Sequence, residues 1–415
     1  MPKKVILMIL FQKFLPDIRV EQEYNALKEA GYRVIVIADK NGWEDNNYEI
    51  IRIDPRQRWS NWFNMTLSFN PILKSLITKE LIRKGVEHVD VIHVHDLFWA
   101  FLGLNLKRYF NCKLVIDLHE NYPEFIKNTK IRGKIGEMLK TKKQKANTIV
   151  RDLIHPHSTI LAILQKQAYS IKRLFAYEDH ILQKCDRFIV VVKESLDRFK
   201  QKDYYKTGII VSNTKDPGLW SFKNLPDLNK KLKVTYVGTV QDLRGLDTAI
   251  MAMKYLNQEE YELNIVGIKL GSLIHKDFLR IMEEYKIRNV NLVEWLENES
   301  AAFSYINNSH ICIIPHKNSG LTQTTIPHKL FMYMAIGRPV LVSDVAPLKR
   351  IVSESNCGLV FKAEDPCDFS DKLKKMKNTE LLQQLAINGR RAIENTYNWA
   401  HDKERLLKMY SELCS

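Results

Sequence analysis

The chain has 415 residues, a formal net charge of +15 and 45% hydrophobic residues. This length exceeds one ordinary hydrophobic core and predicts two domains, and a content of only 16 glycines excludes a collagen-like or low-complexity protein. No apolar run approaches the roughly 20 residues that span a bilayer, and the six scattered cysteines lack metal-ligand or redox spacing. The composition therefore favours a globular protein of the reducing cytosol, and no nucleic-acid-binding module is recognised.

Short apolar runs alternate with amphipathic helical patterns along the chain. The apolar start is interpreted as a buried strand, because it is too short for a secretory signal. Continuous runs of β-branched residues predict strands buried on both faces, and hence parallel sheets covered by helices. Such runs occupy residues 5–10, 34–37, 91–94, 114–116, 188–192, 234–237, 263–266, 290–293, 311–314 and 340–342, with clear helices at 21–30, 246–256 and 277–285.

The chain divides into two such α/β units. A polar stretch after a predicted helix at 194–200 places the boundary near residues 207 and 208. We expect a first domain over residues 1–207, a second over 208–396, and a C-terminal helix within 397–415 that packs back onto the first. Ligands of parallel sheets bind at the carboxyl ends of the strands, so the functional residues are sought there.

The segment 126–182 interrupts this alternation, because it has no strand pattern. Its apolar residues recur at helical spacing, and its first part carries eight basic residues between Lys127 and Lys145 against the single acid Glu137. Two interpretations remain open. The segment is an amphipathic helix pair packed on its own domain, or its cations and apolar side chains bind an anionic membrane surface.

Polar side chains follow two strands of the first half. His93 and His95 alternate onto one face and precede Asp96, a set that suits zinc or iron. No third ligand on the same face can be named, so we expect buried polar groups here and no metal. His119 and Glu120 follow the next strand, and a functional role is favoured for both.

Two loops of the second half predict an anion site. The strand at 234–237 ends at Gly238, where the backbone can approach a ligand, and Arg244 follows with a guanidinium suited to phosphate. Further on, Pro327 marks the start of a helix after a short polar loop. The amides of residues 323–326, at the positive end of that helix, would hold a phosphate group.

The order and spacing of several motifs resemble the retaining glycosyltransferases of family 4, which have the two-domain GT-B fold. The resemblance spans nearly the whole chain. The motifs are Asp17-Ile18-Arg19-Val20, Asp117-Leu118-His119-Glu120, Val211-Ser212-Asn213, Gly238 with Arg244-Gly245, Lys329-Leu330-Phe331, Tyr333-Met334-Ala335, Gly337-Arg338-Pro339 and Asn398-Trp399.

The resemblance implies two Rossmann-like domains facing a cleft, with a helical insertion in the first. It also implies His119 as the catalytic residue at the transferred sugar, and Arg19 and Glu120 on the acceptor side. No metal or other cofactor is implied, because in this family the donor phosphate takes the acceptor proton. The implied donor-binding residues are Gly238, Arg244, Thr324, Thr325, Lys329 and Met332.

The chain departs from the family at the donor site. Two glutamates eight positions apart normally contact the sugar and the ribose, and their positions are occupied here by Thr324 and Met332. Thr324 can still bond a hydroxyl, whereas the Met332 thioether is a weak acceptor. A glycine-rich first loop is also missing.

The leading hypothesis is a retaining glycosyltransferase that uses a nucleotide-sugar donor and a lipid-linked or glycan acceptor. Such an enzyme would serve cell-surface polysaccharide or glycoconjugate synthesis, in the cytoplasm and peripherally on the inner face of the membrane. The alternative is a non-catalytic GT-B subunit or scaffold with a degenerate donor site. A sugar-nucleotide epimerase on the same architecture is a third hypothesis, because fold alone does not fix function.

Overall fold

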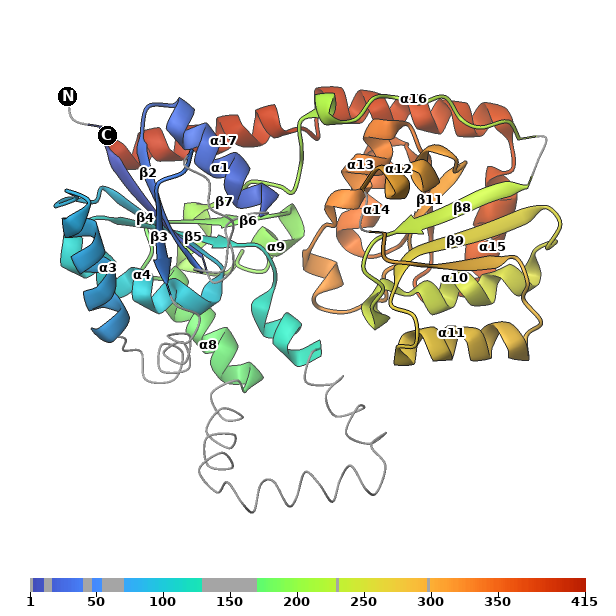
Figure 1. Ribbon diagram of the computed structural model, residues 1–415, viewed down its shortest axis with the longest axis horizontal. Coiled ribbons are helices and arrows are strands. Elements are labelled where there is room, and N and C mark those ends of the chain that lie inside the picture. Colours follow the sequence, from blue (N-terminus) through green and yellow to red (C-terminus); the bar gives the residue numbers. More distant parts are fainter. Residues whose placement is uncertain are drawn as a thin grey trace, which may run out of the picture. The chain divides into compact units, whose positions relative to one another are not determined.

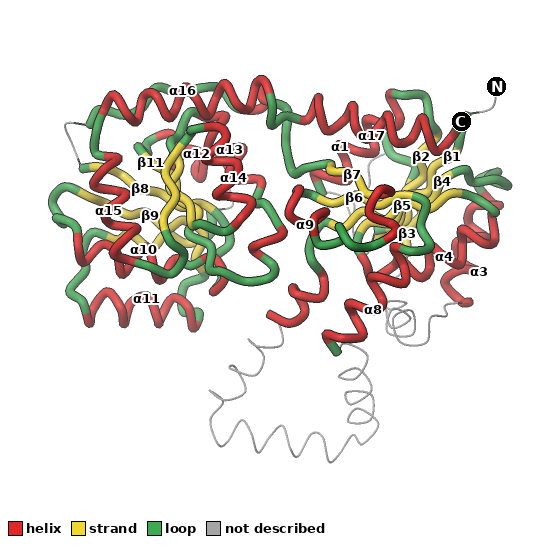
Figure 2. Tube along the Cα trace, turned by 180° about the vertical axis from the view of Figure 1, so that it is seen from behind, coloured by secondary structure: helices red, strands yellow, loops and turns green. Residues whose placement is uncertain are grey.

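The computed structural model describes residues 3–10, 17–39, 47–53, 71–128, 170–228, 231–296 and 299–415. They form two compact units. The first comprises Met1–Val211 together with Lys403–Ser415, and the second comprises Ser212–Asp402. In each unit a parallel sheet is enclosed by helices on both faces (Figure 1), and the view from behind shows the same layers (Figure 2).

The first unit contains a parallel sheet in the order β3-β2-β1-β4-β5-β6-β7. Its strands are β1 Val5–Ile9, β2 Arg33–Asp39, β3 Ile50–Ile53, β4 Val91–His95, β5 Lys113–Leu118, β6 Arg187–Val190 and β7 Gly208–Ile210. Its helices are α1 Ile18–Glu29, α3 Pro71–Arg83, η2 Leu97–Trp99, α4 Ala100–Phe110, α8 Ile171–Leu182, α9 Lys193–Asp197 and η3 Asp203–Thr207, with most of α17 Trp399–Cys414.

The second unit contains a parallel sheet in the order β10-β9-β8-β11-β12-β13. Its strands are β8 Leu232–Val237, β9 Tyr261–Ile268, β10 Val290–Glu294, β11 Ile311–Ile314, β12 Val340–Ser343 and β13 Gly358–Phe361. Its helices are η4 Pro217–Leu219, η5 Asp242–Arg244, α10 Leu246–Ala252, η6 Met253–Tyr255, α11 Leu273–Glu284, α12 Glu299–Asn307, η7 Thr322–Thr324, α13 His328–Ile336, α14 Ala346–Ser355, α15 Pro366–Met376 and α16 Thr379–Asn395.

The prediction of two Rossmann-like parallel sheets is confirmed. Each expected apolar run forms a strand, and the runs in β4 and β11 are buried along their whole length because helices cover both faces. The sequence analysis missed β3, β7 and β13. All three lie at sheet edges and are only three or four residues long, so they carry little apolar signal.

Because of the edge strand β7, the boundary between the two units lies a few residues later than expected. The expected boundary lay at residues 207 and 208, but Gly208–Ile210 pairs with β6 and so belongs to the first sheet. The chain therefore leaves the first unit after Val211 and returns to it after Asp402.

Most of the segment 126–182 lies outside the described residues. The part that is described includes α8, whose Ile181 and Leu182 are buried in the core of the first unit. Whether the remainder binds a membrane stays a prediction. Within the described residues, none of the helices has both the length and the apolar character needed to cross a bilayer.

Candidate functional site

The carboxyl ends of β4 and β5 bring the polar residues of the first unit together. The two strands are parallel neighbours, and their register places His95 opposite Asp117. Asp96 and His119 follow these strands, so their side chains lie at the same edge of the sheet. Helix α1 adds Arg19 in its first turn, and the Asp17 side chain caps this helix by accepting from the Val20 amide.

Arg19 and Asp117 form a buried ion pair. The Arg19 NH2 group donates to Asp117 Oδ1 at 3.0 Å and to Oδ2 at 3.1 Å, while NH1 donates to the Val211 carbonyl at 3.0 Å. The Asp117 side chain is fully buried. Burial alone would raise the pKa of this carboxyl, but Arg19 and His119 hold it well below its usual value. Asp117 is therefore a carboxylate at neutral pH, and Arg19 is held largely inside the unit.

His119 is hydrogen-bonded through one ring nitrogen and faces a carboxylate with the other. Its Nε2 lies 3.0 Å from Asp117 Oδ2 and 3.2 Å from His95 Nδ1, and its Nδ1 lies 3.8 Å from Asp96 Oδ1. Burial opposes the charged imidazole, but Asp96 and Asp117 together raise the pKa of His119 to about 10. His119 is thus a fixed cation at neutral pH, suited to stabilising negative charge or donating a hydrogen bond and unable to accept a proton.

Asp96, which the sequence analysis named only as a possible metal ligand, lies beside His119. Its backbone has φ 68° and ψ 159°, a conformation that is costly for a residue other than glycine. Its amide donates to the Asp117 carbonyl at 2.8 Å. The strained geometry directs attention to Asp96 as a functional residue beside His119, a role that the sequence pattern did not indicate.

In the second unit, a glycine allows a lysine to approach a loop. Gly238 follows β8 with φ 139°, and a Cβ atom there would lie 2.6 Å from Lys329 Nζ. Lys329 lies in the first turn of α13 and is 7% exposed. Its ammonium donates to the Tyr236 hydroxyl at 3.3 Å, and that hydroxyl donates to the Thr239 carbonyl. Burial and the nearby Arg244 lower the pKa of Lys329 to about 7.

Arg244 is held next to a neutral histidine. Gly245, with φ 66°, lies so close to the Pro315 carbonyl that a Cβ atom would be 1.8 Å from it. This close approach brings Arg244 NH1 to His316 Nε2 at 3.1 Å, and the ring nitrogen must accept because arginine only donates. Burial and the cations Arg244 and Lys329 hold the pKa of His316 well below its usual value. Sequence reasoning did not identify His316.

The two cations lack an acidic partner. Throughout the part of the chain that the structure describes, no carboxylate forms an ion pair with Arg244 or Lys329. Arg244 Nε is buried without a hydrogen-bond partner in the same part of the chain. Buried cations are normally paired, so this arrangement is complete only when an anion binds. The first turn of α13 adds the positive end of a helix dipole.

Several hydrogen-bonding groups of the loop before α13 are already used within the loop's own turn. The Gln323 and Thr324 amides donate to the Ser319 and Leu321 carbonyls, so two of the four amides expected to hold phosphate are already used. The Thr324 hydroxyl donates to the Gly320 carbonyl at 2.8 Å, and the Thr325 hydroxyl donates to Leu321 at 3.1 Å. A hydroxyl oxygen that donates a hydrogen bond can in general also accept one. The Gln323 side chain accepts from the Ala346 amide at the start of α14.

The structure therefore groups the predicted residues into one set in each unit. Gly238, Arg244 and Lys329 lie together in the second unit, next to the turn that carries Thr324 and Thr325, and Met332 is half-buried one turn further along α13. In the first unit Arg19 and His119 share Asp117, and Glu120 is half-buried next to His119.

Two family profiles match the chain in the order of its two units. The profile described as Glycosyltransferase Family 4 matches residues 18–211, and the profile described as Glycosyl transferases group 1 matches residues 231–378. Together they cover every strand of the two sheets except β1, and both groups of polar residues described above.

Curated relatives match over shorter stretches. An uncharacterized glycosyltransferase of Methanocaldococcus jannaschii is 24% identical over 182 residues, which are 43% of this chain and 47% of the relative. An uncharacterized 41.2 kDa protein in the cps region of Klebsiella pneumoniae is 23% identical over 33% of this chain and 34% of its own length. The matched part is thus less than half of each relative.

Solved structures match the whole chain in fold. Sucrose-phosphate synthase from Thermosynechococcus elongatus has 18% identity and a TM-score of 0.69, covering 99% of both chains. Anabaena HepE in complex with UDP has 11% identity and a TM-score of 0.69, covering 99% of this chain and 100% of its own. The architecture is GT-B, and with both family profiles matched the chain belongs to the glycosyltransferases of group 1, family 4.

Proposed function

We propose that the chain transfers a sugar from a nucleoside diphosphate donor to an acceptor, with retention of configuration at the sugar. One observation carries this proposal: next to the Gly238 loop lie two cations, the buried Lys329 and the half-buried Arg244, and among the described residues no carboxylate pairs with either of them. A diphosphate supplies the anion that this pair lacks. HepE, of the same fold, was solved with UDP, which makes a nucleoside diphosphate the first ligand to test.

The cations would act mainly on the leaving group. As the sugar departs, negative charge develops on the diphosphate, and fixed donors in a dry site stabilise that charge without reorganising. Lys329 and Arg244 are such donors, and Thr324 and Thr325 would accept hydrogen bonds from hydroxyl groups of the sugar.

His119 would contact the transferred sugar as a charged hydrogen-bond donor. Because its pKa is raised to about 10 between Asp96 and Asp117, it would hold its proton throughout the reaction. The family mechanism requires no protein base, since the donor phosphate takes the acceptor proton, and a permanently protonated His119 is consistent with that mechanism. No metal is needed for the transfer itself.

The acceptor is proposed to be a lipid-linked or glycan hydroxyl compound in cell-surface polysaccharide or glycoconjugate synthesis. Glu120, next to His119, would bond an acceptor hydroxyl, and Arg19 would position this side of the site by holding Asp117. The basic segment from Lys127 to Lys145 would bring the protein to the anionic inner face of the membrane, where lipid-linked acceptors lie.

A non-catalytic GT-B scaffold is the second candidate. It is favoured by the replacement of both family glutamates, since Thr324 donates to its own turn and Met332 offers no strong acceptor. A scaffold would bind a partner enzyme and would transfer no sugar. The two candidates differ in one measurable property, the turnover of a nucleotide sugar.

The test is a panel of nucleotide sugars with purified full-length protein. Calorimetry with UDP, GDP, ADP and CMP identifies the base, and hydrolysis or transfer assays then follow the matching sugar nucleotides. Turnover that falls in His119→Ala while nucleotide affinity is retained supports the transferase, because a group acting on the transition state affects kcat more than ground-state binding. Nucleotide binding without turnover for any sugar supports the scaffold. Failure to bind any nucleotide refutes the donor site.

A further inference from the structure

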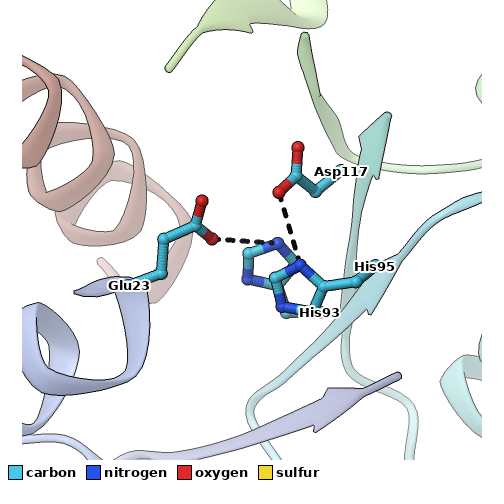
Figure 3. Close-up of side chains that lie close together, drawn as sticks. All are labelled: Glu23, His93, His95 and Asp117. Carbon is cyan, nitrogen blue, oxygen red and sulfur yellow. Dashed lines mark ion pairs between the residues drawn. The ribbon is translucent and has the colours of Figure 1, made fainter. Parts of the chain in front are cut away.

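Four buried side chains of the first unit converge, and only Asp117 among them has a part in the proposed transferase function. Glu23 comes from α1, His93 and His95 from β4, and Asp117 from β5, and one ligand atom of each lies within 4.8 Å of those of the others. Figure 3 shows the two carboxylates pointing toward the two imidazoles, which stack with ring centroids 4.3 Å apart. The sequence analysis expected no metal here because it could name only the two histidines on one face.

The cluster contains polar atoms without hydrogen-bond partners. The side chains of Glu23, His93 and Asp117 are fully buried, and that of His95 is 2% exposed. Among the described residues, Glu23 Oε2 and His93 Nε2 have no hydrogen-bond partner, while Glu23 Oε1 forms an ion pair with Arg19 at 3.2 Å. Each such group costs free energy unless something binds it, and in native proteins an ion, a water molecule or a proton usually does so.

The spacing suits an ion better than direct bonds. His93 Nε2 and Glu23 Oε2 are 3.8 Å apart, too far for a hydrogen bond, and His95 Nδ1 and Asp117 Oδ2 are 3.3 Å apart. Ligands of a tetrahedral zinc ion, each about 2.0–2.2 Å from the metal, are roughly 3.3–3.6 Å from one another. His95 and Asp117 already have this spacing. The ligand atoms that lie furthest apart, within 4.8 Å of one another, would approach by about 1 Å through side-chain rotation.

Arg19 contacts both carboxylates of the cluster with a single positive charge. Its NH2 group lies 3.2 Å from Oε1 of Glu23 and donates to both oxygens of Asp117, whereas Oε2 of Glu23 faces His93. Two buried acids therefore share one guanidinium, and a metal ion would supply further positive charge beside them.

His93 also has the support expected of a metal ligand. Its second ring nitrogen, Nδ1, lies 2.8 Å from the Tyr410 hydroxyl of α17. When Nδ1–H donates to that hydroxyl, the lone pair of Nε2 is directed at the ion, and such a second hydrogen bond is typical of ligating histidines. If His95 Nδ1 bound the ion, His119 Nε2 would lose its contact with that nitrogen and would keep its hydrogen bond to Asp117.

We propose that Glu23, His93, His95 and Asp117 form a closed structural site for one divalent transition-metal ion, with Zn²⁺ as the first probe. A donor set of two imidazoles and two carboxylates suits zinc, and four protein ligands without an open position indicate a structural role. The ion would join α1 to β4 and β5. The proposal does not depend on the transferase function, because none of the donor-site residues of the second unit takes part.

The experiment uses full-length protein stripped with a chelator and then titrated with Zn²⁺ alone. We expect a single ion per chain, a higher melting temperature with the ion, and visible absorption bands when Co²⁺ replaces zinc. Tyr410→Phe keeps the ring and removes only the hydroxyl, so it should fold and bind zinc about 10–100-fold more weakly. His93→Gln should abolish stoichiometric binding.

His88→Gln is the matched control. His88 is exposed and lies 3.4 Å from Asp90, so it is a histidine–carboxylate pair that could hold an adventitious ion. Unchanged zinc binding in this variant, together with the loss in Tyr410→Phe, supports the buried site. No binding by the wild-type chain overturns the proposal, as does binding that disappears in His88→Gln or is unchanged in Tyr410→Phe. If His93→Gln fails to fold, the Tyr410→Phe titration and the Co²⁺ spectrum still decide.

Discussion

The two units treat buried charge in opposite ways. In the first unit Asp117 is surrounded by Arg19, His95 and His119, so the charge of this carboxylate is compensated by neighbouring bases. In the second unit the buried Lys329 and the half-buried Arg244 lie near a neutral His316, with no carboxylate paired to them among the described residues. Both sets lie at the carboxyl edge of a parallel sheet, so topology does not explain the difference.

The difference separates a site that is already assembled from one that is prepared for a ligand. A buried pair that is fully hydrogen-bonded costs little to keep, whereas an unpaired buried cation costs stability until an anion arrives. The first unit should therefore respond to mutation mainly through folding, and the second mainly through binding. The predictions below test this contrast, beginning with the largest expected effect.

Asp117→Asn should destabilise the first unit by about 3–5 kcal/mol, because it leaves Arg19 buried beside a neutral amide. Denaturant unfolding followed by circular dichroism measures the effect as an earlier transition of that unit. The control is Asp242→Asn, which removes an exposed carboxylate paired with Lys317 and should cost less than about 1 kcal/mol. Similar small losses in both variants would show that the Asp117 cluster is not a compensated unit.

Lys329→Met should have the opposite consequence for folding. Removing an uncompensated buried cation should raise the melting temperature, while nucleoside diphosphate binding weakens by about 1.5–3 kcal/mol, the scale of a lost charged hydrogen bond. Arg244→Ala should weaken binding by a similar amount. Calorimetry and thermal melting on the same samples give both quantities. A Lys329→Met protein that melts earlier and binds nucleotide normally would assign Lys329 a purely structural role.

More of the fold than of the two sites could be predicted from the sequence. The central strands were predictable because burial on both faces demands continuous apolar runs, as in β4 and β11. Edge strands such as β7 were not, because three residues carry no periodicity and their pairing is set by the rest of the sheet. The motifs also pointed to Gly238, Arg244 and Lys329, which lie together in the structure.

The partners of those residues could not be predicted. Arg19 meets Asp117 across 98 positions of sequence, and Glu23 and His93 also lie far apart in the sequence, so only the folded sheet brings them together. The strain at Asp96 and the neutral state of His316 likewise arise from tertiary contacts. Local patterns supply candidate residue types, whereas charge compensation is a property of the assembled structure.

The pH dependence of nucleotide binding provides a finer test of the uncompensated site. Because the pKa of Lys329 is lowered to about 7, the free protein loses this charge above neutral pH, and a bound diphosphate must recover the proton. Affinity should therefore fall between about pH 7 and 9, by at most about tenfold per pH unit. Lys329→Arg keeps its charge over this range and should bind with much less pH dependence. Equal pH profiles for the two proteins would show that Lys329 is charged throughout and is compensated in some other way.

The smallest expected effect comes from restoring an acid to the second unit. Met332 is half-buried on α13 at the position where the family has a glutamate for the ribose. Met332→Glu should tighten UDP binding by about 1 kcal/mol, because a carboxylate accepts from a ribose hydroxyl. The gain should be absent with 2′-deoxy-UDP and in Met332→Gln, which offers an uncharged amide oxygen instead. If the carboxylate paired with Lys329 three residues earlier, the melting temperature would rise and UDP binding would weaken. That result would show that an acid within the second unit can neutralise Lys329. It would also show that the absence of such an acid in the natural chain favours the binding of a diphosphate.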